Sequence, residues 1–392
     1  MSQLESVFLL DAVRTPFGRN RGGLSHIRTD DLAALPIAEL VARHPQLDPA
    51  EIDDVYLGNT NGAGEENRNV ARMAALLAGL PVTVPGATVN RLCASGGEAL
   101  IQAGRAVATG DAAVVIAGGV EGMSRAPYVL PKSDEALGRG MQLHQTTVGW
   151  RMVNPKFPHE WVASLGACAE RVAHELGIGR EEQDAWAVRS HERALAAWDA
   201  GLHDDYVMKT GDVTRDESLR PGTTTETLAA LSPAFTADGT VTAGNSSPIN
   251  DGALAALVGG QRLADRLGTE PLGRIVASAT VATEPDRFSV APVPAIARAL
   301  DRAGLDHADV DLWEVNEAFA AMVLSTLSQM PDVDLDRVNV NGGALALGHP
   351  LGASAPRVVV DLCRELRRRG GGVGVAAACI GVGLGQAVVV RV

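Results

Sequence analysis

Apolar and polar residues are arranged along this chain in two patterns, one typical of strands and one typical of helices. Short apolar or β-branched runs, typical of buried strands, cover residues 7–11, 112–119, 312–315, 373–379 and 387–392. Apolar residues three or four positions apart, typical of helices, cover residues 30–43, 98–107 and much of 161–200. This alternation predicts an α/β protein whose sheets are covered by helices on both faces.

Part of this pattern occurs twice. Residues 47–58 and 305–316 align without gaps and share Leu, Asp, Ala, an acid, a β-branched residue and Asp. The series of strand, turn, helix and strand that begins at 88–90 is followed later by a similar series that begins at 338–341. Two matches in the same order predict a duplicated α/β unit.

The segment between the two copies differs in composition. Residues 121–243 collect prolines, histidines and most of the aromatic residues. We expect this segment to be an inserted loop domain of the kind that covers a site. The N-terminal half would then be residues 1–120, completed by about 244–270, and the C-terminal half residues 271–392.

Composition excludes several classes of function. The chain has 392 residues, of which 46% are hydrophobic, and a formal net charge of −13, which argues against nucleic acid as a partner. No apolar run is long enough to span a bilayer, and residues 1–10 do not form a signal peptide, so we expect no membrane association. The four cysteines, of which none form a Cys-x-x-Cys pair, predict a reducing cytoplasm and no metal site.

One cysteine lies at a predicted strand-to-helix turn. Residues 84–89 form a turn and a short strand, Cys93 follows among small residues, and the helix 98–107 comes next. Backbone N–H groups at a helix N-terminus favour the thiolate over the thiol. A buried structural cysteine explains the same stretch, since free cysteine is among the most buried residue types. Both interpretations stay open at this point.

Three further segments combine reactive side chains with small residues. They contain Asn316, His349 and Cys379, which we place in turns beyond strand ends, where open α/β sheets form their sites. Alone, each has a structural explanation: His349 as a hydrogen-bonded core residue, Asn316 as a helix cap. Together they supply a cysteine nucleophile with a base and oxyanion donors. The glycines of 381–385 lead into a strand, which argues against a dinucleotide fingerprint.

With these segments in place, the chain resembles the thiolases, which cleave or form 3-ketoacyl-CoA thioesters. The resemblance spans essentially the whole chain and rests on residues 90–96, 117–124, 242–245, 316–320, 342–350 and 379–381. It implies a five-layered αβαβα fold of two similar halves with a loop domain that binds CoA. It also implies CoA as co-substrate, no tightly bound cofactor, and a homo-oligomer, either a dimer or a homotetramer.

The resemblance assigns catalytic roles by position. Cys93 would be the acylated nucleophile, His349 its activator, and Cys379 the acid/base for the acetyl carbon and the incoming CoA. Asn316, through a bound water, would join His349 in one oxyanion hole. The N–H groups of Cys93 and Gly381 would form the other. A thiol suits the acid/base role because surroundings can tune its pKa from about 8.5 towards neutral.

The resemblance also places Arg220, Phe235, Ser247 and Phe319 near CoA. Arg220 would supply positive charge in an acidic protein, and the aromatic rings would flank the adenine or pantetheine. A solvated surface arginine is the structural alternative for Arg220.

Several positions depart from the family pattern. Pro248 and Pro356 stand where glycines are usual, and residues 164–166 and 288–292 differ where the acyl tail and pantetheine are handled. Residues 66–73, 149–155 and 379–383 look like the β-ketoadipyl-CoA thiolases of aromatic-acid catabolism, although Arg68 and Arg151 there have structural explanations too.

The sequence therefore predicts CoA-dependent cleavage of a 3-ketoacyl-CoA to acetyl-CoA and a shortened acyl-CoA, or the reverse condensation, in fatty-acid or aromatic-acid catabolism. One alternative is a ketoacyl synthase-type condensing enzyme, which typically uses two histidines where this chain offers a second cysteine. Another is a thiolase-like carrier of CoA esters or lipids, catalytically altered by Pro248 and Pro356.

Overall fold

The strands of this protein join two similar halves into one hydrogen-bonded sheet. The computed structural model describes residues 5–133, 136, 138 and 140–392. Residues 1–4, part of the expected N-terminal half and of the start segment 1–10, lie outside it, as do residues 134, 135, 137 and 139 of the expected loop domain. Within the described residues the strand order is β10-β11-β12-β9-β1-β8-β5-β3-β4, with β2 beside β8.

The strands fall where the apolar runs predict them. The N-terminal half contains β1 (Val7–Arg14), β2 (Gly18–Arg19), β3 (Asp54–Gly58), β4 (Ala87–Val89), β5 (Val114–Gly122) and β8 (Asn250–Gly259). The C-terminal half contains β9 (Gly273–Ala282), β10 (Leu312–Val315), β11 (Val373–Ile380) and β12 (Leu384–Arg391). Every residue of β5, β8 and β11 is buried, as expected for strands covered on both faces.

The two halves repeat one pairing scheme. In the first, β3 runs parallel to β5, and β5 and β1 flank β8 in antiparallel pairs. In the second, β10 runs parallel to β11, and β11 and β9 flank β12 in the same way. The two matching sequence segments each form a 3-10 turn, η1 (Pro49–Glu51) and η5 (His307–Asp309), and then the strands β3 and β10.

The copies differ at one edge. In the first half β4 pairs with β3 over three residues. Around 338–341, which we expected to match it, the structure has only a single parallel bridge between Trp313 and Val338. The polar side chain of Asn339 bonds the N–H and the carbonyl of Val315 at 2.8 Å each, which occupies groups that a longer ladder would use.

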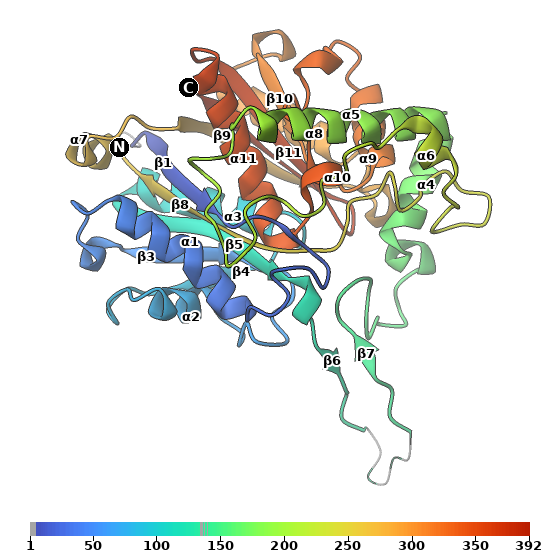
Figure 1. Ribbon diagram of the computed structural model, residues 1–392, viewed down its shortest axis with the longest axis horizontal. Helices are drawn as coiled ribbons and strands as arrows, with labels where there is room; N and C mark the ends of the chain where they lie inside the picture. The colour runs from blue at the N-terminus through green and yellow to red at the C-terminus, as the bar shows by residue number, and fades with distance from the viewer. Residues whose placement is uncertain (1–4, 134–135, 137, 139) are drawn as a thin grey trace.

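Helices complete five layers. α1 (Thr29–Arg43) and α2 (Val70–Leu77) cover the outer face of the N-terminal strands, and α8 (Pro292–Ala303) covers the outer face of β9 and β12. α3 (Ser95–Thr109) and α11 (Leu351–Arg368) pack against each other between the two sets of strands. Figure 1 shows α1 and α2 below the N-terminal strands and the red α11 between them and β11. α7 (Gln261–Leu267) links the halves.

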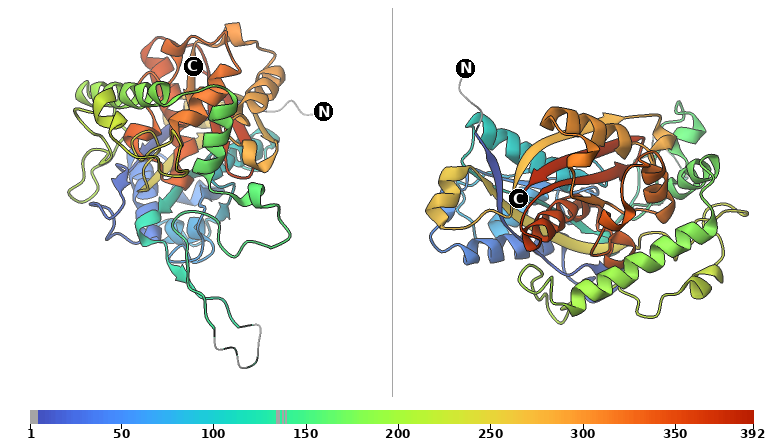
Figure 2. Two further views of the ribbon diagram at one scale, coloured as in Figure 1. Left: turned by 90° about the vertical axis from the view of Figure 1, so that its right-hand side faces the viewer. Right: turned by 90° about the horizontal axis from the view of Figure 1, so that it is seen from above.

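The segment 121–243 lies against the C-terminal half and extends beyond it. Its short strands β6 (Tyr128–Val129) and β7 (His144–Gln145) pair with each other and project away from the body in Figure 1. Its helices are α4 (Leu165–Glu175), α5 (Arg180–Asp199) and α6 (Thr225–Ala229). α5 runs along the side of the molecule (Figure 2) and packs on α9 (Ala320–Ser328) and α10 (Ala344–Leu347). The short 3-10 helices are η2 (Met123–Arg125), η3 (His159–Val162), η4 (Pro285–Arg287) and η6 (Leu335–Arg337).

A buried ion pair ties this segment to the N-terminal half. Arg14 of β1 and Asp216 pair at 2.7 Å, and both side chains are inaccessible to solvent. Asp216 also accepts from the N–H of Phe17 at 2.7 Å and from the indole of Trp198 at 3.2 Å. Breaking such a pair costs about 3–5 kcal/mol because the remaining charge stays buried. No helix among the described residues is long and apolar enough to cross a membrane.

Candidate active site

Cys93 lies in the tight turn between β4 and α3. The Asn90 side chain accepts a hydrogen bond from the N–H of Leu92 (2.9 Å), and the Ser95 hydroxyl donates to the Leu92 carbonyl (2.6 Å). These bonds stabilise the left-handed backbone of Leu92, whose φ is 47°. The turn therefore holds Cys93 directly before α3, with 6% of its surface exposed.

The end of β11 supplies the second cysteine. Cys379 lies inside the strand, opposite Gly385 of β12, and not in a turn beyond the strand end as we expected. The antiparallel pairing with β12 continues to Ile380 and so keeps Cys379 extended. Gly381 comes next, and its backbone N–H lies near enough to the sulfur of Cys93 to act against the rise in the pKa of that thiol.

Small apolar residues bring the two cysteines together. Ala94, Ala355, Ala378 and Ile380, which flank the cysteines or lie in α11, form one buried cluster. The proximity is also electrostatic, since charge on Cys93 raises the pKa of Cys379. The two predicted thiols and the predicted N–H donor therefore share one site.

Both thiols are neutral at rest, which corrects our expectation. Burial raises the pKa of Cys93 to about 11, although the N–H groups of Gly381 and of Cys93 itself act against the rise. Burial, and then the charge of Cys93, raise the pKa of Cys379 well above its usual value. The helix N-terminus that we expected to favour a thiolate is outweighed because the site excludes water.

His349 lies between α10 and α11 with a fixed backbone and ring. Its N–H donates to the Asn250 side chain at 2.9 Å. Its Nδ1 is 2.6 Å from the Ser354 hydroxyl, which itself donates to the Pro350 carbonyl at 2.8 Å. Because the hydroxyl hydrogen is already used, Nδ1 must donate, and the lone pair of the ring is on Nε2.

This tautomer makes His349 a proton acceptor. Its Nε2 is buried and has no hydrogen-bond partner among the described residues. Burial, and then the charge of Arg357, lower the pKa of the ring to about 3, so the imidazole is neutral at physiological pH. A neutral ring with a free Nε2 can take a proton from a nearby thiol.

The first turns of α3 and α11 lie in close contact. A Cβ on Gly96 would be 2.3 Å from the Gly352 carbonyl, and one on Gly119 would be 2.0 Å from the same atom. Pro356, which replaces a usual glycine, packs its ring 2.6 Å from the Gly96 Cβ position and leaves the Gly352 carbonyl outside the helix ladder. Cys93 and His349 each lie three residues before one of these touching glycines. Pro356 thus fits the site and does not disrupt it.

Asn316 follows β10 and is joined through its backbone to β11, the strand that carries Cys379. Its N–H donates to the Ala377 carbonyl of β11 at 2.8 Å. Both polar atoms of its side chain are buried without hydrogen-bond partners among the described residues. It does not cap the helix that follows, because α9 begins only after Phe319. An amide left unpaired in this way is available to a substrate or to a water.

Two carboxylates that the sequence did not single out support these residues. Glu317 accepts hydrogen bonds from Trp186 (2.9 Å), Ser190 (2.6 Å) and Asn339 (2.9 Å), which anchors the segment that carries Asn316. The available signal for Glu317 was an acid two residues after an apolar strand.

Glu121 supports the opposite wall of the site. It accepts from the backbone N–H groups of Thr60 (3.0 Å), Asn61 (3.1 Å) and Gly352 (3.0 Å). Burial raises the pKa of Glu121 to about 7, and its charge contributes to the raised pKa of Cys93. This residue connects the N-terminal half with the start of α11.

Three of the four residues expected near CoA lie together. The rings of Phe235 and Phe319 meet edge to face at 5.8 Å, and the N–H of Ser247 donates to the Ala318 carbonyl at 3.0 Å. Ser246 forms a bridge with Phe319. Arg220 is exposed, and its backbone N–H donates to His191 at 3.4 Å. No contact joins Arg220 to the aromatic pair.

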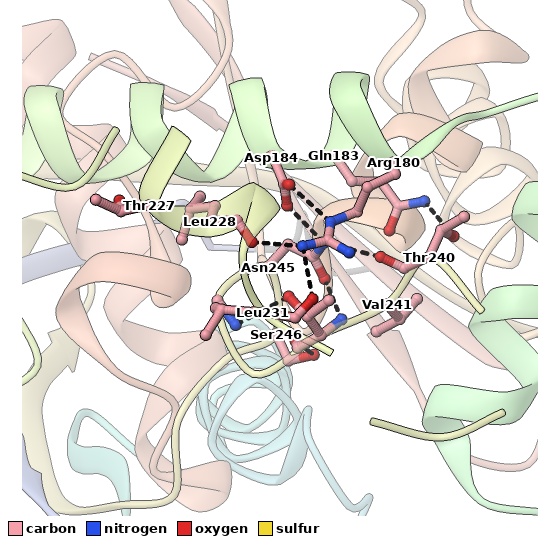
Figure 3. Close-up of polar contacts among 12 residues, drawn as sticks. Arg180, Gln183, Asp184, Thr227, Leu228, Leu231, Thr240, Val241, Asn245 and Ser246 are labelled. Carbon is pink, nitrogen blue, oxygen red and sulfur yellow. Dashed lines mark hydrogen bonds and ion pairs between the residues drawn. The ribbon is translucent and has the colours of Figure 1, made fainter. Parts of the chain in front are cut away.

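A network of polar contacts fixes the loop that carries Ser247 (Figure 3). The Asn245 amide donates to Asp184 of α5 at 2.9 Å, and its oxygen accepts from the N–H of Thr242 at 2.8 Å. Arg180 bonds both Asp184 and the Leu231 carbonyl beyond α6. The Asn245 carbonyl accepts from the N–H of Ala320 at the start of α9. The 242–245 motif is thus a rigid support, and it acts at a distance from the thiols.

Ser354→Ala tests whether the hydroxyl sets the imidazole tautomer. We expect kcat to fall by about tenfold or more, because Nδ1 loses its acceptor and Nε2 no longer stays unprotonated. Ser354→Thr, which keeps the hydroxyl, should recover most of the rate and the wild-type pH profile. Steady-state assays across pH decide this; wild-type kcat and pH profile in Ser354→Ala would contradict the assignment.

Comparison with known proteins gives a consistent result over the whole chain. A family model described as "Thiolase, N-terminal domain" matches residues 7–261, and "Thiolase, C-terminal domain" matches residues 269–392. The 3-oxoadipyl-CoA/3-oxo-5,6-dehydrosuberyl-CoA thiolase of Escherichia coli (strain K12) is 48% identical, with 99% of this chain and 100% of that protein covered. The β-ketoadipyl-CoA thiolase of Pseudomonas knackmussii is 47% identical, with 98% of each chain covered.

Solved structures agree. The acetyl-CoA acetyltransferase of Bacillus anthracis superposes with a TM-score of 0.91 at 36% identity and covers 100% of both chains. Human mitochondrial 3-ketoacyl-CoA thiolase also gives 0.91, at 37% identity, with 100% of this chain and 99% of that chain covered. These likenesses confirm the predicted fold class.

Proposed function

This chain belongs to the thiolase family, and we propose that it cleaves a 3-ketoacyl-CoA with CoA through an acyl intermediate on Cys93. Two observations support this most: the two buried thiols influence each other electrostatically, and the buried Nε2 of His349 has no hydrogen-bond partner among the described residues. Among the described residues, no group of three or more His, Cys, Asp or Glu side chains is placed to hold a metal ion.

In the first half-reaction His349 Nε2 takes the proton of Cys93, and the sulfur attacks the C3 ketone of the substrate. The N–H groups of Cys93 and Gly381 receive the developing oxyanion; such a donor contributes about 3–4 kcal/mol. The C2–C3 bond then breaks, and its electron pair forms the enolate of acetyl-CoA. Cys379 donates its proton to C2, which releases acetyl-CoA.

In the second half-reaction Cys379, now a thiolate, takes the proton of the incoming CoA thiol. The CoA sulfur attacks the acyl-Cys93 carbonyl, and the same two N–H groups hold the oxyanion again. The shortened acyl-CoA leaves, and the Cys93 sulfur regains its proton from His349. Two half-reactions that share one acyl-cysteine predict ping-pong kinetics.

The amide of Asn316 and Nε2 of His349 act on the other carbonyl of the substrate, the thioester of the acetyl unit. A water held by Asn316 would donate to the enolate oxygen there. Because the site is buried away from bulk solvent, a fixed donor is worth more than it would be in water.

CoA would enter beside Phe319 and Phe235. The two rings and Ser247 offer an apolar face and a polar edge, which suit pantetheine, and Arg220 supplies charge for a phosphate. A homo-oligomer, as dimer or tetramer, and a cytoplasmic location stay predictions.

We further propose that the acyl chain is β-ketoadipyl, as in the named relatives, and that the reaction serves aromatic-acid breakdown. Thiolysis of β-ketoadipyl-CoA should proceed with a kcat/KM about tenfold or more above that of acetoacetyl-CoA, because recognition of a charged group discriminates strongly. Acetyl-CoA release, followed for both substrates at fixed CoA, measures this. Equal values for the two would contradict the substrate but not the thiolase reaction.

A further inference from the structure

An apolar cavity of about 570 Å³ adjoins the active site, and its lining includes Trp150, Met152, Phe157, Trp161 and Val382. One charged side chain, Arg151, is part of this lining. Asn154 is the other polar residue of the lining. A mostly apolar cavity with one arginine in its wall suits a short carbon chain that ends in an anion.

The cavity begins next to the nucleophile. The Trp150 ring is 3.2 Å from the position that a Cβ on Gly381 would occupy, and the N–H of Gly381 lies near enough to the Cys93 sulfur to affect the pKa of that thiol. Val382, the next residue, lines the cavity too. An acyl chain attached to Cys93 could therefore pass the Trp150 ring into the cavity.

Arg151 is positioned but not neutralised. Its Nη2 donates to the Asn61 side-chain oxygen at 3.1 Å, and no carboxylate pairs with it among the described residues. Asn61 is itself fixed, because its amide donates to the Thr146 hydroxyl at 2.9 Å and its N–H to Glu121 at 3.1 Å. In a chain with 47 acidic against 34 basic residues, an arginine without a carboxylate partner is available to an anionic ligand.

A chain of contacts through Asn61 also connects the guanidinium to the turn that carries the thiol. The neighbouring residue Thr60 donates from its hydroxyl to the carbonyl of Leu92, which precedes Cys93, at 3.2 Å. Arg151 is thus linked to the nucleophile from two sides, through Trp150 and through Asn61. In β-ketoadipyl-CoA the terminal carboxylate lies only a few bonds beyond the ketone that Cys93 attacks.

From this arrangement we propose that Arg151 binds the terminal carboxylate of the acyl chain and selects dicarboxylic 3-ketoacyl-CoA substrates. The proposal rests on the proposed function and adds the residue that sets the substrate class. Trp150 and Met152 contact the methylene carbons, while the free N–H groups of Arg151 bind the carboxylate. Asn61 is a positioning residue that orients the guanidinium.

The test compares Arg151→Met with wild type on two substrates. For β-ketoadipyl-CoA we expect kcat/KM to fall by about 10- to 100-fold, mainly through KM, because a charged hydrogen bond is lost. For acetoacetyl-CoA, which has no terminal carboxylate, the change should stay within about threefold. Arg151→Lys keeps the charge and should retain part of the preference. Arg298→Met, on the exposed face of α8, is the matched control and should match wild type on both substrates.

A second measurement separates recognition from folding. The methyl ester of β-ketoadipyl-CoA lacks the charge, so wild type and Arg151→Met should cleave it at similar rates. Equal losses of the Arg151→Met variant on all three substrates would overturn the proposal and indicate a structural role. A wild type that prefers acetoacetyl-CoA would instead refute the proposed substrate, and that result comes before any variant is made.

Discussion

Cys93→Ser should lower thiolytic kcat by a factor of about a thousand or more, because a serine hydroxyl is a far weaker nucleophile beside a neutral imidazole. The acyl-enzyme should disappear as well. Intact-protein mass spectrometry after mixing with acetyl-CoA should show one acetyl group on wild type and none on the variant. The fold should be kept, since sulfur and oxygen differ little in size.

A matched cysteine gives the control. Cys168 lies buried in α4 and does not belong to the small-residue cluster around the thiols, so Cys168→Ala should keep activity within about twofold. Iodoacetamide should modify Cys93 of the wild type, and acetyl-CoA should block the reaction. Substantial thiolysis by Cys93→Ser, or an acyl group on another residue, would remove the nucleophile from the mechanism.

Cys379→Ser should separate the two half-reactions. The variant keeps Cys93, His349 and the N–H of Gly381, so it should still become acylated when mixed with acetyl-CoA. Turnover should fall by about 10²–10⁴, because a hydroxyl cannot take up and release the CoA proton at neutral pH. Single-turnover acylation and steady-state thiolysis, measured side by side, give the two rates.

Exchange of the acetyl-CoA methyl protons with solvent tests the acid/base role of Cys379 separately. Wild type should exchange the methyl protons of acetyl-CoA with deuterated water, because Cys379 removes and returns a proton at C2. In Cys379→Ser this exchange should be lost while the acyl-enzyme still forms. A variant that exchanges and turns over like wild type would show that another group is the acid/base.

Much of this site is visible in the sequence because its parts are local. Cys93 stands between a strand and a helix, and Gly381 follows an apolar strand, so a reader of the chain finds both without coordinates. The duplication is equally visible, since segments 47–58 and 305–316 keep their hydrophobic spacing. The strand expected around 338–341 is reduced to a single bridge, because the Asn339 side chain bonds the backbone of β10.

Protonation states were predicted wrongly for a physical reason. The pKa of a thiol depends on how much water reaches it, and that depends on packing between segments far apart in sequence. The local sequence shows that Cys93 precedes the N-terminus of α3. It does not show that residues of β11 pack beside this turn in a buried cluster. The partner of His349 was missed for a similar reason, since a serine one turn into a helix has no distinct pattern.

The contact between α3 and α11 has a consequence for which substitutions the enzyme can tolerate. Gly96 of α3 and Gly119 of β5 both lie so close to the Gly352 carbonyl of α11 that neither has room for a side chain. A single methyl group added at that seam would wedge the repeats apart and draw sulfur away from imidazole, while each repeat kept its own strands. Replacing any one of these three glycines by alanine should therefore abolish activity at temperatures where the protein is still folded.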